Sequence, residues 1–421
     1  MRRVAFHSEN GPGIGGSDIV MGAIADQLDR AVWDLYALVR PDYPTEVVFR
    51  RLPLPVMIGD GETANSSGAA RIVEDARSTC VQHQTSSVRW AKQLTRGLIP
   101  PVARRWLGYR RCAARVRETL KSNRIEFFQT MDGGPQPTVL GARQAGCRVV
   151  AAYNAPPPQE PVDRFTRSYS RRSFMTAHAR IGVSRHSIGL WADFLRVDPN
   201  EFRLIYNGVD VEDNAGIDPA QVRAELGIPE SAVVVGMTGR MCAGKGAPVL
   251  ARAAVAVARA HPEVLFLFTG SGAELPAVEQ IFREDGLGDR VRLLGFRPDA
   301  PRVTAAYDVA VVPSVVPESF GIVVIEAMAW AKPVIGSRTG GIPEIIVDGK
   351  TGLLVEPGDP GALARSLAEL LSSPLRRREM GRAGFERVTQ QFTRKAMLTG
   401  YEELYRELLA GAPQRSGGGP R

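Results

Sequence analysis

Two glutamates, Glu318 and Glu326, lie on either side of a predicted helix start in the second half of the chain. An apolar run at 309–314 predicts a strand before them, and apolar residues at helical spacing from residue 322 predict a helix. Ser319 is a suitable N-cap for that helix, which would place Glu326 two turns into it. The pattern therefore predicts a strand, a loop and a helix that present two carboxylates.

The first turn of this predicted helix offers backbone N–H groups to a ligand. Phe320, Gly321 and Ile322 fall where such groups lack an intrahelical partner, at the positive end of the helix dipole. Such a turn binds anions, and the glycine lets a ligand approach the backbone closely. The residues indicate a site for an anion flanked by hydroxyl groups. A surface loop followed by an amphipathic helix with a solvated glutamate is the alternative.

A basic pair, Arg240 and Lys245, follows a predicted strand at 233–236. Only Met-Cys-Ala-Gly separates the two residues, so both can project from one loop at the carboxyl end of the strand. Arginine can bind two phosphate oxygens with its planar fork, and lysine adds a mobile point charge. The pair predicts a diphosphate site, whereas two exposed basic side chains in an ordinary loop are the alternative.

These residues together resemble the retaining glycosyltransferases of family four, the group 1 glycosyl transferases of the GT-B fold. The resemblance is strong over roughly residues 200 to 410 and weaker before them. Its residues are Glu318-Ser-Phe-Gly-Ile, Glu326-Ala-Met-Ala, Lys332-Pro-Val-Ile, Gly340-Gly-Ile-Pro-Glu344, Gly349-Lys-Thr-Gly352, Thr238-Gly-Arg240, Lys245-Gly246, Gly15-Gly16 and Val183-Ser184.

The resemblance implies retaining transfer of a sugar from a nucleoside-diphosphate sugar to a hydroxyl acceptor, which could be a glycan, a glycolipid or a small molecule. It implies that Arg240 and Lys245 hold the leaving diphosphate and that Glu318, the third expected catalytic residue, lies beside the donor sugar. Glu326 would bond the ribose hydroxyl groups. The other expected donor-binding residues are Gly15, Gly16, Asn154, Gly239, Ser319, Phe320, Gly321 and Ile322.

Neither a metal ion nor a cofactor is expected, because no DxD pair occupies a matched position and the nucleotide sugar is itself a substrate. We expect retention through same-face attack, in which the leaving phosphate accepts the proton of the acceptor hydroxyl. No carboxylate of the matched motifs is required on the opposite face of the sugar. A nucleotide-sugar epimerase of the same fold and a catalytically silent scaffold are the rival hypotheses.

Two features of the first half bear on the donor. Asn154 follows a predicted strand at 149–153, where many members of the family carry a histidine that contacts the donor sugar. Its amide either replaces that contact or leaves it to another residue. A strand at 4–7, a glycine-rich turn at 9–16 and a helix at 17–28 form the opening of a Rossmann-like sheet. The turn could instead be simply flexible.

The length of 421 residues predicts two domains, since one core seldom supports such a chain. Alternating strands and helices predict an α/β fold of two doubly wound Rossmann-like domains, which in the GT-B fold face each other across a cleft. The expected parts are residues 1–200, with a helical insertion at about 62–122 on the acceptor side, then 201–375, closing helices at 376–410 and a flexible tail at 411–421.

The composition suggests a protein of the cytoplasm. There is no apolar run of about 20 residues and no signal-peptide pattern. The four cysteines, Cys80, Cys112, Cys147 and Cys242, lack CxxC spacing, so we interpret them as reduced thiols.

The net charge of +8 suggests anionic partners. Residues 92–121 carry nine basic residues and one acidic residue, interleaved with apolar ones, and could contact an anionic membrane. A solvated basic face of a helix is the alternative. Nucleic-acid binding is not expected, since no recognition motif accompanies the charge.

Overall fold

The computed structural model describes residues 2–8, 24, 33–39, 56–58, 63–64, 100–131, 136–158 and 162–411. Contacts divide the chain into two units. Unit 1 comprises residues 1–183, 188–205 and 401–421, and unit 2 comprises residues 184–187 and 206–400. The domain limits and the helical insertion that we predicted from the sequence remain predictions.

Unit 2 is built on a six-stranded sheet in which every pair of neighbouring strands is parallel. Apolar runs at 233–236, 264–269, 291–294, 309–312, 334–337 and 353–355 predict six strands in this half of the chain, and all six are confirmed. They read as apolar runs because a parallel sheet is covered on both faces. In sheet order the strands are β11 (Val291–Gly295), β10 (Val264–Thr269), β9 (Val233–Thr238), β12 (Val309–Val312), β13 (Val334–Ser337) and β14 (Gly352–Val355).

This order contains a topological switch point. Strands β9, β10 and β11 follow one another toward one edge, and β12, β13 and β14 follow one another toward the other. The order therefore reverses between β9 and β12, which pair through Val309 with Val235 and Ala310 with Gly236. In a doubly wound sheet the loops after the two strands at the switch point diverge to opposite faces and leave a crevice at the carboxyl edge, where ligands bind.

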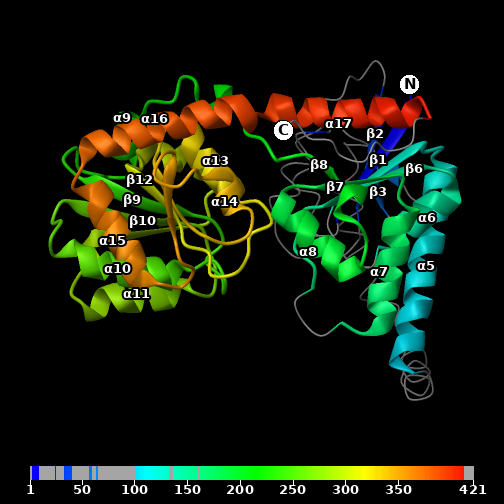
Figure 1. The fold of residues 1–421 in the computed structure, drawn as a ribbon, viewed down its shortest axis with the longest axis horizontal. Coiled ribbons are helices and arrows are strands. Elements are labelled where there is room, and N and C mark those ends of the chain that lie inside the picture. The colour runs from blue at the N-terminus through cyan, green and yellow to red at the C-terminus, as the bar shows by residue number, and fades with distance from the viewer. Residues whose placement is uncertain are drawn as a thin grey trace. The chain divides into compact units, whose positions relative to one another are not determined.

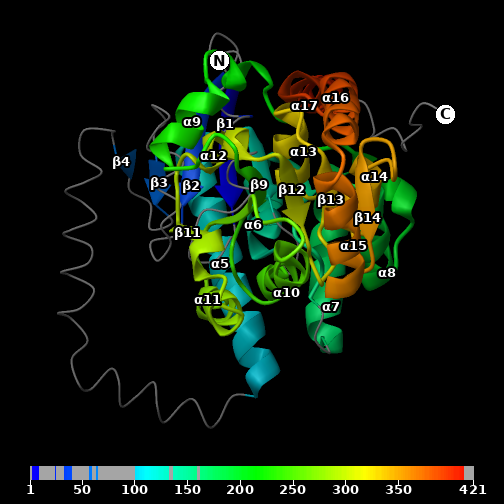
Figure 2. The ribbon, with the colours of Figure 1, turned by 90° about the vertical axis from the view of Figure 1, so that its left-hand side faces the viewer.

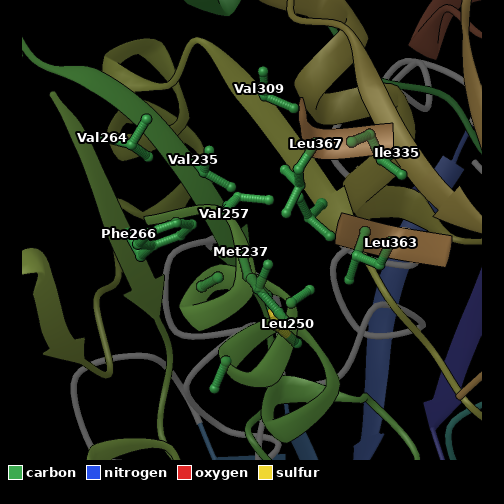
Figure 3. Packing of buried hydrophobic residues seen from close by; sticks show 14 of the residues in the cluster. Val235, Met237, Leu250, Val257, Val264, Phe266, Val309, Ile335, Leu363 and Leu367 are labelled. Carbon is green, nitrogen blue, oxygen red and sulfur yellow. The ribbon is translucent and has the colours of Figure 1, made fainter. Parts of the chain in front are cut away.

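Helices cover both faces of the unit 2 sheet (Figures 1 and 2). Helices α10 (Ala247–Ala258), α11 (Leu275–Glu284) and α15 (Pro360–Leu371) lie on one face, and α13 (Ile322–Ala329) and α16 (Pro374–Gln391) pack together on the other. The first face forms the core drawn in Figure 3, where Leu250 and Val257 of α10 and Leu363 and Leu367 of α15 meet the strand residues. The shorter helices are α9 (Pro219–Glu225), α12 (Ala300–Val303) and α14 (Ile342–Ile345).

Unit 1 holds a second sheet, and the α/β fold with two doubly wound sheets is thereby confirmed. Its strands are parallel except that β3 and β4 are antiparallel, and the order again reverses between β1 and β5. In sheet order they are β4 (Thr63–Ala64), β3 (Val56–Ile58), β2 (Trp33–Val39), β1 (Arg2–Ser8), β5 (Phe127–Met131), β6 (Arg148–Tyr153), β7 (Ala179–Gly182) and β8 (Arg203–Leu204). The sequence also predicts a strand at 47–52, which lies outside the described residues.

Alternate residues of the unit 1 strands face different helices. Phe128 belongs to a core shared with α5 (Pro101–Ser122), α6 (Pro137–Ala145), α7 (Arg164–Thr176) and α8 (Arg185–Leu195). Its neighbours Phe127 and Gln129 instead meet Tyr405 of α17 (Arg394–Leu409), by a ring contact and a hydrogen bond respectively. Helix α17 begins in unit 2, and from Tyr401 onward its residues belong to unit 1.

Helix α5 is the described part of the basic segment at 92–121. It buries Ala113, Val116 and Leu120 in unit 1, and Trp106 on its outer side is 40% exposed with the Arg110 guanidinium over its ring. The other exposed basic residues are Arg104, Arg105, Arg111, Arg115 and Lys121, of which Arg105 forms an ion pair with Asp163. The helix is therefore amphipathic, with a basic outer face. Among the helices of the described residues, none is long and apolar enough to cross a membrane.

Removal of Leu367 tests the core of unit 2. Leu367→Ala empties a fully buried position between α15 and the sheet, so unfolding of this unit should cost about 2 to 5 kcal/mol less. Leu375→Ala, at a position that is 60% exposed, is the control and should change little. Urea titrations monitored by hydrogen exchange of unit 2 amides measure the loss of unfolding free energy in both variants. An equal loss in the two variants would contradict this packing.

Candidate functional site

Lys245 and Glu318 meet at the switch point of the unit 2 sheet. Lys245 lies in the loop between β9 and α10, and Glu318 lies in the loop between β12 and α13. The Lys245 Nζ atom donates to Glu318 Oε1 at 2.5 Å. The hydroxyl of Ser314, which is 1% exposed, donates to the same oxygen at 2.6 Å. The structure thus brings together two of the three residues expected to be catalytic, and it pairs them with each other.

Two glycines allow three loops to touch at this point. A Cβ atom on Gly246 would lie 1.9 Å from the carbonyl oxygen of Pro313, so only glycine lets the β9 loop approach the β12 loop. A Cβ atom on Gly340 would lie 2.1 Å from the carbonyl oxygen of Glu318, which brings in the β13 loop. Both glycines have positive φ, at 77° and 62°, a region that other residues rarely occupy. The backbone around Lys245 and Glu318 is therefore closely packed.

Arg240 lies at the same edge of the sheet. It follows Gly239, whose N–H donates to Thr269 O at 2.9 Å, so the turn is tied to the end of β10. The Arg240 side chain is exposed and makes no hydrogen bond or ion pair with another residue in the described part of the chain. The basic pair thus comprises one cation with a carboxylate partner and one cation open to solvent.

Helix α13 begins later than its sequence suggests. Its N-cap is Gly321, with no side-chain cap, so the expectation that Ser319 caps the helix is wrong. The reason is that Gly321 adopts a left-handed backbone conformation, after which the helix starts at Ile322 and reaches Glu326 within little more than one turn. The Ser319 hydroxyl is buried without a partner among the described residues, and the Ser319 carbonyl accepts from Ser184 Oγ at 2.5 Å.

Phe320 is a core residue of unit 2. Its side chain is 3% exposed and packs against the rings of Tyr206 and Phe392. Tyr206 and Phe392 also contact each other, which closes a three-ring cluster. Of the 319–322 segment, Phe320 therefore offers a ligand its backbone and not its ring.

Glu326 stands on α13 in an apolar setting. Its neighbours along the helix, Ile325 and Ala327, are buried, whereas Glu326 itself is partly exposed. Desolvation raises the pKa of its carboxyl group to about 7. Burial favours the neutral form of such a group, because the charged form loses hydration. Glu326 is thus a carboxylate whose charge is costly until a partner donates to it.

Glu344 organises the loop after β13, a role that the sequence analysis missed. Its carboxylate accepts from the N–H groups of Arg185 and His186, at 2.9 and 2.8 Å, and from Tyr206 OH at 2.9 Å. Burial and this carboxylate raise the pKa of Tyr206. The signal was present in Gly340-Gly-Ile-Pro-Glu344, which matched the family without a role for its glutamate. Ser314 was also not predicted, although it is a polar residue two positions after the end of an apolar strand, β12.

The remaining expected donor contacts belong to unit 1. Asn154 follows β6, and its amide nitrogen lies 3.6 Å from the Met131 sulfur. Its amide oxygen is buried and has no partner in the described part of the chain. Gly15 and Gly16 lie outside the described residues. Their roles and that of Asn154 therefore remain predictions.

Two family models match adjacent parts of the chain. A model described as Glycosyl transferases group 1 matches residues 219–387, and one described as Glycosyltransferase Family 4 matches residues 76–213. The first contains the unit 2 residues described above, from Arg240 to Glu344.

Curated proteins with similar sequences are glycosyltransferases and a related synthase. A D-inositol 3-phosphate glycosyltransferase of Segniliparus rotundus is 35% identical over 237 residues, which cover 54% of this chain and 52% of that protein. An N-acetyl-alpha-D-glucosaminyl L-malate synthase of Bacillus anthracis is 32% identical over 214 residues, covering 51% of this chain and 56% of that protein. The chain spans about half the length of the curated relatives it matches.

Solved structures share the fold over almost the whole chain. HepE of Anabaena, in complex with UDP, has a TM-score of 0.75 at 20% identity and covers 97% of this chain and 100% of its own. Sucrose-phosphate synthase of Thermosynechococcus elongatus has a TM-score of 0.72 at 22% identity and covers 98% and 100% respectively.

The raised pKa of Glu326 predicts a pH-dependent stability. A carboxyl group with a folded pKa of about 7, above its ordinary value of 4.5, favours folding below pH 4.5, and this contribution is lost as the pH rises through 7. Glu326→Gln should therefore stabilise unit 2 at pH 8, by about 1 to 3 kcal/mol, and change it little at pH 4.5. Glu279→Gln, in an exposed ion pair, is the control. If thermal melts give the same stability difference between Glu326→Gln and the wild-type chain at both pH values, the raised pKa of Glu326 is contradicted.

Proposed function

The chain belongs to the family 4, or group 1, glycosyl transferases, and from this premise we propose that it transfers a hexosyl group with retention from a nucleoside-diphosphate sugar to an acceptor hydroxyl. The observation that carries the proposal is a cluster at the switch point of the unit 2 sheet, in which Lys245 contacts Glu318 while Arg240 lies in the same loop as Lys245, at the edge of the sheet where α13 begins. Two cations and a helix N-terminus suit a diphosphate, and carboxylates suit the hydroxyl groups on either side of it.

The donor is proposed as a class and not as one compound. HepE has been solved with UDP and with UDP-glucose, which makes UDP-glucose the first donor to test here. The curated relatives are named for D-inositol 3-phosphate and for L-malate. Any hydroxyl compound of this size, as well as a glycan or a lipid-linked sugar, is a candidate acceptor.

The proposed reaction depends more on stabilising the negative charge of the leaving diphosphate than on proton donation by a general acid. A diphosphate must leave the anomeric carbon through an oxocarbenium-like state, so negative charge grows on the phosphate oxygens. Arg240, Lys245 and the N–H groups at the start of α13 are fixed donors for that charge. The departing phosphate then accepts the proton of the acceptor hydroxyl on the same face of the sugar. A divalent ion is not expected to be needed for this step.

Glu326 is proposed as the ribose ligand, supported by its setting. Desolvation raises the pKa of its carboxyl group, which accepts no hydrogen bond from another side chain in the described part of the chain. Two ribose hydroxyl groups would give it the donors that it lacks. Asn154, Gly15 and Gly16 remain predicted donor-binding residues.

Location and further partners are also proposals. The outer face of α5, with Trp106 among arginine side chains, would suit the surface of an anionic bilayer. Peripheral contact of a cytoplasmic enzyme with such a membrane, and through it a lipid-linked acceptor, thus remains a prediction. Sedimentation with vesicles of anionic and of neutral lipid would distinguish this contact from a solvated helix face.

Loss of either cation should weaken nucleotide binding. Arg240→Ala and Lys245→Ala should each reduce the affinity for UDP by about 1.5 to 3 kcal/mol, because a charge-assisted contact to the diphosphate disappears. Calorimetry measures the change, and Arg252→Ala, on α10 outside this cluster, is the control. Unchanged affinity in both variants would exclude the diphosphate site.

Substitution of the two glutamates should change different kinetic constants. Glu326→Ala should mainly raise KM for the donor, because the ribose contact is the same in the ground and transition states. Glu318→Ala should lower kcat, because the sugar beside it gains charge in the reaction. Single-turnover measurements at saturating donor separate these effects from slow product release.

The opposite pattern, with the chemical step lost in Glu326→Ala and kept in Glu318→Ala, would reverse the two assignments. Product analysis with and without acceptor tests the reaction class itself. Transfer that keeps the anomeric configuration supports the proposal, whereas an epimerised sugar formed without acceptor would identify an epimerase.

A further inference from the structure

The Lys245 side chain has an anionic partner within the chain itself. Glu318 Oε1 accepts from Lys245 Nζ at 2.5 Å, with 28% of the lysine side chain and 17% of the glutamate side chain exposed. The same oxygen accepts from the Ser314 hydroxyl at 2.6 Å. A lysine meant to hold a diphosphate therefore has its charge neutralised by the carboxylate meant to lie beside the sugar.

The backbone on both sides of this pair is fixed. Gly244 O accepts from Val315 N at 2.9 Å, which joins the loop of Lys245 to the loop of Glu318. Gly341 N donates to Glu318 O at 2.8 Å, which ties Glu318 to the loop after β13. Any exchange of partners at this site must therefore come from side-chain rotation. The four-carbon stem of lysine allows that rotation.

A diphosphate competes with Glu318 for the same cation. It carries more negative charge than one carboxylate, and it would also contact the solvent-exposed Arg240 and the start of α13. Glu318 opposes binding in two ways, because it occupies Lys245 and because its own charge repels the phosphates. Once Lys245 turns to the phosphates, the Glu318 carboxylate keeps its hydrogen bond from Ser314 and becomes available to the sugar.

We propose that Glu318 is the internal counterion of Lys245, that the donor diphosphate displaces it, and that Ser314 positions the released carboxylate for the sugar. This inference rests on the nucleotide-sugar transferase function proposed above. Glu318 then has two successive partners, which are Lys245 before the diphosphate binds and the donor sugar afterwards. We also assign Ser314 as a positioning residue that acts through Glu318.

The proposal predicts that a damaging active-site substitution tightens product binding. Calorimetry is carried out with UDP, GDP and ADP, and the diphosphate that binds the wild-type chain most tightly is used for the variants. Glu318→Gln should bind this diphosphate about three- to tenfold more tightly, because Lys245 then breaks no ion pair when it turns to the phosphates. Glu318→Gln should at the same time lower kcat. Glu225→Gln, which removes the carboxylate charge from the Arg302 ion pair elsewhere in unit 2, is the control and should leave the affinity unchanged.

A double-mutant cycle separates the counterion from general repulsion. If Glu318 acts by occupying Lys245, most of the gain from Glu318→Gln should vanish in the Lys245→Ala background, where no lysine remains to be released. A gain of equal size in both backgrounds would mean that Glu318 merely repels the phosphates, which overturns the proposal. Unchanged or weaker binding in folded Glu318→Gln would overturn it as well.

Because the Ser314 side chain is buried, Ser314→Ala can lower activity simply by disturbing the fold. Its test therefore needs a kinetic readout that a structural role alone would not change. Ser314→Ala should lower kcat at saturating donor with a smaller change in KM, and the loss should disappear in the Glu318→Gln background, where the carboxylate to be positioned is gone. A loss of equal size in both backgrounds would make Ser314 a structural residue only. If none of the three diphosphates binds, or if they bind and Lys245→Ala leaves their affinity unchanged, the donor site itself is misassigned. If they bind through Lys245 but Glu318→Gln gives no gain, only the exchange of partners fails.

Discussion

The site depends on the close contact of three loops at the carboxyl edge of the unit 2 sheet. The carbonyl oxygen of Pro313 occupies the space where a Cβ atom of residue 246 would be, and the backbone of Glu318 does the same at residue 340. The loops after β9, β12 and β13 can therefore touch without side chains between them. A lysine from one of these loops donates to a carboxylate from the next. The parallel sheet sets the loops side by side, and the two glycines allow their backbones to approach closely.

Much of the unit 2 fold could be predicted from the sequence, for a physical reason. Strands covered on both faces must be apolar throughout, so an apolar run such as Val264–Thr269 can be recognised as a strand from the sequence alone. The basic pair and the two glutamates could also be predicted to lie near one edge, since each follows a strand of the same parallel sheet. The pairing of Lys245 with Glu318 could not, because it depends on side-chain torsions across loops 73 residues apart in sequence.

The misses have equally specific causes. Ser319 has the right chemistry for an N-cap, but the positive φ of Gly321 makes the helix begin after it. Phe320 was expected at the ligand, yet it packs with Tyr206 and Phe392, residues too distant in sequence for any local pattern to connect. Glu344 stood within a recognised motif, but its backbone partners at Arg185 and His186 come from another part of the chain. In each case a long-range contact decided the outcome.

The central claim is that the switch point of unit 2 binds a diphosphate and that Lys245 changes partner when it does. The most direct measurement is a crystal structure of the chain with its best-binding nucleoside diphosphate. The account predicts phosphate oxygens at about 3 Å from the Arg240 guanidinium and the Lys245 amine, with that amine no longer on Glu318. A diphosphate bound elsewhere, with the contact between Lys245 and Glu318 intact, would contradict it.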